Sequence, residues 1–143
     1  MTYITKNVPS ALVIHPDWEE VRAFSEGKIA VRINGKEGYI NESGEWVIKP
    51  AYDSCSPFRF GFACIKVTGR WGVIDTKGDL LGGRYFDEVT SFKDEKCWVR
   101  SKGKVGSLDA KGSLTWVRAI NHLPVGFLSE NYDKMSEAWI QSL

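Results

Sequence analysis

Residues 58–80 read FRFGFACIKVTGRWGVIDTKGDL, and much of this pattern recurs 34 residues earlier and 34 residues later. Four columns share this spacing: Phe24, Phe58 and Phe92; Gly35, Gly69 and Gly103; Gly38, Gly72 and Gly106; Gly44, Gly78 and Gly112. A period of about 20 to 50 residues is typical of proteins that copy one supersecondary unit and pack each copy against its neighbours. The sequence therefore predicts an array of small units.

The clearest local structure is a β-hairpin in the first full unit. Residues 28–33 alternate apolar and polar side chains, as in a strand with one buried face. Asn34-Gly35 follows, and this dipeptide favours the positive φ angles of a two-residue type I′ turn. We therefore expect residues 37–41 to pair with the first strand. Thr68-Gly69 and Lys102-Gly103 stand at the same place in the later units, where glycine keeps the turn possible.

A second reversal at residues 42–44 leads into a third short strand, residues 45–48, so each unit is predicted to be a three-stranded antiparallel meander. Residues 49–53 and 83–87 are expected to be loops that place an aromatic ring beside an acidic side chain. Because Asp53 and Asp87 recur in register, we expect each carboxylate to accept hydrogen bonds from the backbone N–H groups of a local turn.

The whole chain is predicted to be one all-β domain, residues 1–143, that carries one short helix at its C-terminal end. The units span about residues 12–23 (partial), 24–57, 58–91 and 92–126, with residues 12–15 as the last strand of the partial unit. In residues 127–143, Ser129 can cap a helix whose apolar stripe covers the open last unit. The stripe consists of Tyr132, Met135, Trp139 and Leu143.

Cross-strand geometry explains one glycine column. In a hairpin that turns at residues 34–35, Val31 faces Gly38 and Ile29 faces Ile40. The missing side chain at Gly38 and its equivalents leaves room for an aromatic ring from an adjacent segment. The candidate rings are Tyr52, Phe58, Phe86 and Phe92. Trp18 and Trp46 are also predicted to lie in the core, since they replace apolar residues of the repeat.

The pattern of residues 58–80, with its Trp71-Gly72 pair, resembles the WG repeat, a β-rich bacterial unit named for that pair. The resemblance extends in register over about residues 12–126, although the tryptophan column reads Glu37, Trp71 and Val105. It implies an interaction module without catalytic residues. Small versions of such proteins are expected to act as partners or inhibitors of other bacterial proteins.

Composition and charge exclude several classes. With 19 basic and 18 acidic side chains the net charge is +1, which argues against nucleic acid and anionic membranes as partners. The first residues lack the features of a signal peptide, and no apolar run is long enough for a membrane span, so a cytoplasmic protein is expected. The three cysteines, Cys55, Cys64 and Cys97, have no metal-site spacing and are expected to be reduced and packed. No metal or cofactor is predicted.

Two repeat positions are basic throughout: Arg32, Lys66 and Arg100 at one, Lys36, Arg70 and Lys104 at the other. They can form a solvated sheet face with charged guards against edge pairing, or a surface for an acidic partner. Lys66 is placed to rest on the ring of Trp71. The third unit is the most basic, and its extra rings either fill space against the terminal helix or anchor an interface. The candidate partner-binding residues are Trp98, Arg100, Lys102, Lys104, Lys111 and Trp116.

The predicted function is that of a non-catalytic protein-binding module, acting as an inhibitor or immunity protein toward a bacterial toxin or effector. Two alternatives remain open: a module that binds glycans or small ligands by stacking on exposed rings, and a structural array that assembles with itself. An enzyme is not expected, because His15 and His122 lie far apart and no nucleophile elbow, phosphate-binding loop or HExxH motif is present.

Overall fold

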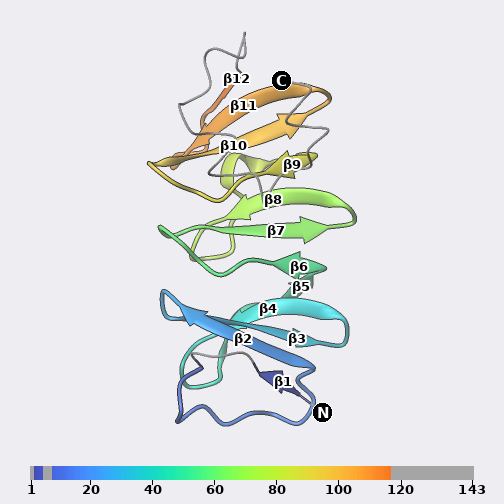
Figure 1. The fold of residues 1–143 in the computed structure, drawn as a ribbon, viewed down its shortest axis with the longest axis vertical. Helices are drawn as coiled ribbons and strands as arrows, with labels where there is room; N and C mark the ends of the chain where they lie inside the picture. Colours follow the sequence, from blue (N-terminus) through green and yellow to red (C-terminus); the bar gives the residue numbers. More distant parts are fainter. Residues whose placement is uncertain (1, 5–7, 117–143) are drawn as a thin grey trace.

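The computed structural model describes residues 2–4 and 8–116 of the chain. Three β-sheets follow one another along the long axis of the molecule, from the N-terminal to the C-terminal end (Figure 1). This stack confirms the predicted all-β array of repeated units. The helix expected within residues 127–143 lies outside the described residues.

Each sheet contains one copy of the predicted hairpin. The first sheet has the order β1 (Tyr3–Ile4), β2 (Glu20–Ser25), β3 (Lys28–Ile33), β4 (Lys36–Ile40) and β5 (Trp46–Tyr52). The second sheet consists of β6 (Ser54–Cys55), β7 (Ala63–Val67) and β8 (Arg70–Ile74), followed by a 3₁₀ turn at Leu81–Gly83. The third sheet has the order β12 (Leu114–Trp116), β11 (Lys104–Asp109), β10 (Lys96–Ser101) and β9 (Glu88–Val89).

The central hairpins form as predicted. Val31 pairs with Gly38 and Ile29 with Ile40, and the turn residues Asn34 and Gly35 have φ angles of 52° and 75°. The equivalent turns repeat this left-handed pair of angles, with values of 51° and 77° at Thr68-Gly69 and of 52° and 78° at Lys102-Gly103. Type I′ geometry therefore joins all three central strand pairs.

A second column of turns was not predicted and adds a further strand before each hairpin. Glu26, Phe60 and Asp94 stand one repeat apart and have φ angles of 52°, 55° and 52°. The flanking pairs are Ser25 with Lys28, Arg59 with Phe62, and Lys93 with Lys96. Strands β2, β6 and β9 thereby pair with the first strand of their hairpins, and the meander gains an entering strand.

The strand that follows the hairpin differs between the units. In the first unit β5 extends through Tyr52, so most of the loop expected at residues 49–53 is strand. In the second unit only isolated bridges remain, between Ile74 and Leu80 and between Trp71 and Phe86. The chain between them contains Gly82 and Gly83 with φ angles of 71° and 68°, a conformation that breaks an extended strand.

The N-terminal end is closed differently from the prediction. Residues 12–15, expected to be a strand, have no regular secondary structure. Instead β1 pairs in parallel with β2, and Leu12 and Trp18 pack into an apolar cluster with Val21. Trp46 packs against the same cluster, and its ring meets that of Trp18 edge-on at 6.5 Å. Both tryptophans thus belong to the core, as predicted.

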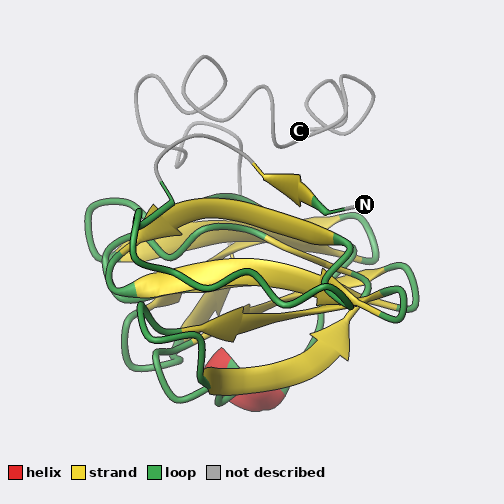
Figure 2. Cartoon of the chain, turned by 90° about the horizontal axis from the view of Figure 1, so that it is seen from below, coloured by secondary structure: helices red, strands yellow, loops and turns green. Residues whose placement is uncertain are grey.

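The first and second sheets each contribute side chains to the core on both of their faces. Ala30 and Tyr39 of the first sheet pack toward Ile65 of the second, whereas Ile29 and Val31 pack toward the N-terminal segment. The next interface is built from Cys64 and Val73 of the second sheet and from Cys97, Val99 and Leu108 of the third. Figure 2 shows the strands crossing the middle of the molecule, with turns and loops at the two ends of the strands.

Gly38, Gly72 and Gly106 each lie in a crowded place, but the neighbouring atoms do not belong to the four rings that the sequence suggested. A Cβ atom on Gly38 would lie 2.5 Å from the carbonyl oxygen of Ile48, because the backbone of β5 crosses directly over it. At Gly72 the nearest atoms belong to Leu80, at 2.7 Å, and to the ring of Tyr85, at 3.1 Å. At Gly106 the nearest atom is on Trp116, at 2.9 Å. The bare position is needed, for a different reason in each unit.

Candidate functional site

The turns at residues 34–35, 68–69 and 102–103 form one edge of the stack, which we call the turn edge. Asp53 accepts a hydrogen bond from the N–H group of Thr68 at 2.8 Å, and Asp87 accepts one from Lys102 at 2.8 Å. Both carboxylates accept hydrogen bonds from backbone N–H groups of a turn, as predicted, but the turn is not the expected local one, since it lies 15 residues later in the following unit. Glu19 holds the turn of the first unit in the same way, through the N–H group of Gly35 at 2.7 Å.

The same carboxylates neutralise one basic column of the turn edge. Asp53 forms an ion pair with Lys36, and Asp87 lies 3.8 Å from Arg70. The hydrogen bonds from Lys36 and from the Thr68 N–H group lower the pKa of Asp53 below its ordinary value. In the third unit the corresponding cation is Lys104, which is exposed and forms no ion pair with a described residue. The next position of the acidic column is Asn121, a neutral residue.

The second basic column is engaged along its whole length. Arg32 forms an ion pair with Glu37 at 2.6 Å, and Lys66 lies 5.3 Å from the centre of the Trp71 ring, as predicted. Arg100 lies 3.2 Å from Glu88. These contacts favour the structural interpretation of this column over that of an open basic surface.

Glu37 stands in the tryptophan column and is the most deeply buried acidic side chain among the described residues, with 1% of its surface exposed. It forms ion pairs with Arg22 and Arg32 and accepts a hydrogen bond from the N–H group of Cys55 at 2.9 Å. This network ties β2, β3 and β4 to the start of the second sheet. A buried charge of this kind requires all of its partners.

The structure divides the six predicted partner-binding residues. Trp98 lies opposite Ser107, whereas Trp116 lies opposite Gly106, so the two rings are on opposite faces of the third sheet. Trp98 is only 8% exposed, and Lys96 lies 5.4 Å from its ring centre. Trp116 is half-buried, with the guanidinium of Arg84 5.7 Å from its ring centre.

The basic members of the set are also divided. Arg100, Lys102 and Lys104 cluster around the turn between β10 and β11. Lys111 lies in the turn at the other end of β11, where its N–H group donates to Asp109 at 2.9 Å. The structure therefore assembles three of the six residues at the turn edge and places Trp98, Trp116 and Lys111 elsewhere.

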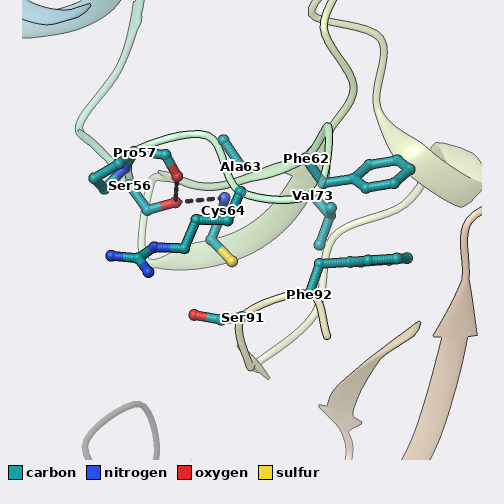
Figure 3. Close-up of a pocket in the computed structure, with 9 residues that line it drawn as sticks. Ser56, Pro57, Phe62, Ala63, Cys64, Val73, Ser91 and Phe92 are labelled. Carbon is teal, nitrogen blue, oxygen red and sulfur yellow. Dashed lines mark hydrogen bonds between the residues drawn. The ribbon is translucent and has the colours of Figure 1, made fainter. Parts of the chain in front are cut away.

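A pocket of about 70 Å³ opens between the second sheet and the segment that follows β9. Figure 3 shows Ser56 and Ser91 on one side of it and the rings of Phe62 and Phe92 on the other. The two rings stack with their centres 4.2 Å apart. Arg59, Cys64 and Val73 also line the pocket. The sequence did not mark any of these three as a binding residue. A comparison of equivalent repeat positions could have located the pocket. Val73 and Ser56 stand one repeat after Tyr39 and Arg22, whose side chains are much larger.

None of the three cysteines is in a disulfide bond, and all three are buried, as expected. Burial raises the pKa of Cys55 to about 12 and also raises that of Cys97, so neither thiol is ionised near neutral pH. Cys64 donates a hydrogen bond to the carbonyl oxygen of Thr90 at 3.5 Å. Within the described ranges, no cluster of three or more histidine, cysteine or acidic side chains is arranged to hold a metal ion. Over the same residues, no helix has the length and hydrophobicity needed to cross a membrane.

Two solved structures show distant similarity to this chain. One match is Kluyveromyces lactis Hsv2 (complete loop 6CD), with 11% identity, a TM-score of 0.49, and coverage of 73% of this chain and 38% of that one. Another is virginiamycin B lyase from Staphylococcus aureus, with 18% identity, a TM-score of 0.39, and coverage of 76% and 44%. The chain thus spans less than half the length of either protein. A search of curated proteins found no match.

The family comparison agrees with the repeat seen in the sheets. The model of the WG containing repeat matches residues 11–36, 38–71 and 71–104, which together contain most of the strands of the three sheets and more than half of the chain. The chain therefore belongs to the family of WG-repeat proteins.

Proposed function

We propose that this WG-repeat protein is a non-catalytic binding module that recognises an acidic protein partner through the turn edge of its third unit. In its most specific form the proposal is an inhibitor or immunity protein that binds a toxin or effector in the cytoplasm. The observation that carries it is the change in charge pairing along the turn edge. Lys36 and Arg70 meet carboxylates of their own chain, whereas Lys102 and Lys104 form no ion pair with a described residue.

The backbone at this edge is well suited to hold those cations in place. The turn that bears Lys102 has a fixed type I′ conformation and is anchored by Asp87. A carboxylate from a partner at this point would complete the acidic column that Glu19, Asp53 and Asp87 begin. Arg100 is already paired with Glu88, so the proposal assigns the main contacts with the partner to Lys102 and Lys104.

Exposed ion pairs are each worth only about 0.2–1 kcal/mol, so the cations alone cannot supply a tight complex. Charges at the rim of an interface act mainly on the association rate and on its dependence on salt. The proposal therefore expects binding that weakens as salt is raised, with apolar contacts elsewhere on the partner contributing most of the affinity.

The test uses the double variant K102E/K104E and the matched control K49E/K77E. The control makes the same change of charge at exposed positions outside the turn edge of the third unit. Proteins captured from a lysate of the producing cell are identified at low and at high salt, and the affinity of each captured protein is then measured after purification. We expect an acidic partner that binds wild type and K49E/K77E and that binds K102E/K104E at least tenfold more weakly. Equal affinity for all three proteins would overturn the assignment of the surface, and a failure to find any acidic partner would overturn the proposed function.

A further inference from the structure

The pocket between the second and third sheets has a counterpart between the first and second sheets, and there the space is filled. Tyr39 occupies it with only 1% of its surface exposed, and its ring meets Phe58 edge-on at 4.8 Å. The hydroxyl of Tyr39 donates a hydrogen bond to the carbonyl oxygen of Ser56 at 2.5 Å. Arg22 lies beside it, directed to Glu37 and to the sulfur of Cys55 at 3.4 Å.

One repeat later, both large side chains are replaced by small ones. Val73 stands in the position of Tyr39, and Ser56 stands in the position of Arg22. The carbonyl of Thr90, which corresponds to that of Ser56, accepts its hydrogen bond from the thiol of Cys64 instead. The backbone register is kept while the filling is lost, and the pocket of about 70 Å³ is the result. At about 10–15 Å³ for each water position, this volume holds roughly five water-sized groups.

The lining of the pocket has an apolar side and a polar side. Val73 and the stacked rings of Phe62 and Phe92 form the apolar side, visible in Figure 3. Ser91 and Arg59 lie at the polar side. Neither the hydroxyl of Ser91 nor the guanidinium of Arg59 is bonded to a group in the described part of the chain, and Arg59 is exposed to solvent. An unpaired guanidinium at the mouth of an apolar pocket complements a carboxylate on a short apolar stem.

We propose that this pocket binds a free short-chain aliphatic carboxylate, with its hydrocarbon stem against Phe62, Phe92 and Val73 and its carboxylate at Arg59 and Ser91. The size of the pocket limits the stem to about three or four carbon atoms. This site is separate from the turn edge, so the inference does not depend on the proposed function. Because so few atoms are buried, the affinity is expected to be in the millimolar range.

The experiment titrates butyrate into the ¹⁵N-labelled full-length protein and follows backbone amide shifts at constant pH and ionic strength. We expect saturable shifts centred on Ser56, Cys64, Ser91 and Phe92. Butylamine, which has the same number of carbon atoms and the opposite charge, should produce no saturable shifts at these positions. Equal binding of butylamine would overturn the assignment of a carboxylate.

Two variants separate the site from non-specific binding. Val73→Tyr rebuilds the filling of the preceding interface and should abolish the saturable shifts, because its hydroxyl can reach the Thr90 carbonyl as Tyr39 reaches that of Ser56. Arg59→Gln changes an exposed side chain, so it leaves the fold intact and should weaken butyrate binding about tenfold. Lys49→Gln, the matched loss of an exposed cation outside the pocket, should bind like wild type. If Val73→Tyr does not fold, Arg59→Gln and butylamine decide the question. Undiminished binding in Arg59→Gln, or an absence of saturable shifts in wild type, would overturn the proposal.

Discussion

The two interfaces between successive sheets share one backbone register and differ in what fills them. The first contains a tyrosine, a buried glutamate and two arginines, and it is closed. The second has valine and tryptophan at the positions of that tyrosine and glutamate, and it contains the pocket. The difference teaches that turns and bare glycines fix the repeat, while the residues between the sheets are free to change. Specific properties are therefore to be sought between the sheets and at the last turn.

The largest loss of stability is expected from removing Glu37, the buried carboxylate of the first interface. Glu37→Ala leaves Arg22 and Arg32 without their shared partner, and such losses cost about 3–5 kcal/mol. We expect a value near the lower limit, because both guanidinium groups keep partial access to water. Urea unfolding of the variant measures the loss. Glu42→Ala, the removal of an exposed carboxylate from a turn, should change the free energy of unfolding by less than about 0.5 kcal/mol. A cost for Glu37→Ala as small as that of the control would show that the network adds nothing to the first interface.

A second comparison concerns the same glycine column in two units. In Gly38→Ala the new methyl group meets the backbone of β5, which cannot move without losing its pairing with β4. In Gly72→Ala it meets the end of the Leu80 side chain, which can change rotamer. Overpacking usually lowers the free energy of unfolding by about 1–3 kcal/mol. We expect a loss of about 3 kcal/mol for Gly38→Ala and of about 1 kcal/mol for Gly72→Ala. Thermal unfolding of both variants at one pH compares them. Equal destabilisation would mean that the two glycines are needed for the same reason.

The smallest effect concerns the turn edge and depends on pH. The pKa of Asp53 is lowered in the folded protein, so the carboxylate contributes stability above its ordinary pKa and loses that contribution as the pH falls through the folded value. The wild-type melting temperature should therefore fall between about pH 5 and pH 3. Asp53→Asn should show a smaller fall, whereas Asp17→Asn, at an exposed position, should follow the wild type. Parallel curves for wild type and Asp53→Asn would contradict a role of this charge in anchoring the turn.

Much of the fold could be predicted because it depends on local turn chemistry. Asn34-Gly35 and its equivalents specify left-handed residues, and the hairpins follow in the expected register. The role of Asp53 and Asp87 could also be predicted, since recurrence in register with the glycines indicated a turn. The second turn column was harder to predict, because its first residues include Glu26 and Phe60, which do not favour positive φ angles, although a glycine follows each of them. There the pairing of the flanking strands imposes the conformation.

The candidate site was less predictable because it depends on which side chains share a face. Trp98 and Trp116 belong to the same repeat unit and were predicted to share one surface, but the strand pairing places them on opposite faces. The pocket depends on the absence of bulk at two positions, Ser56 and Val73, that are distant in the sequence and lie on either side of Cys64 once the second sheet has formed. No sequence motif marks a pocket that is formed by small side chains at two separate positions. A column-by-column comparison of side-chain volumes is the one sequence signal that would have located it.

The direction of the carboxylate contacts has a consequence for synthesis of the chain. Glu19 holds the turn at residue 35, Glu26 accepts hydrogen bonds from the N–H groups of Phe60 and Gly61, and Asp87 holds the turn at residue 102. In each of these contacts with a backbone N–H group, the carboxylate that accepts precedes the donor in the sequence. During synthesis on a ribosome, each of these carboxylates is therefore made before the turn to which it bonds. Growth of the array in this order never leaves a completed turn waiting for a residue that has yet to be made.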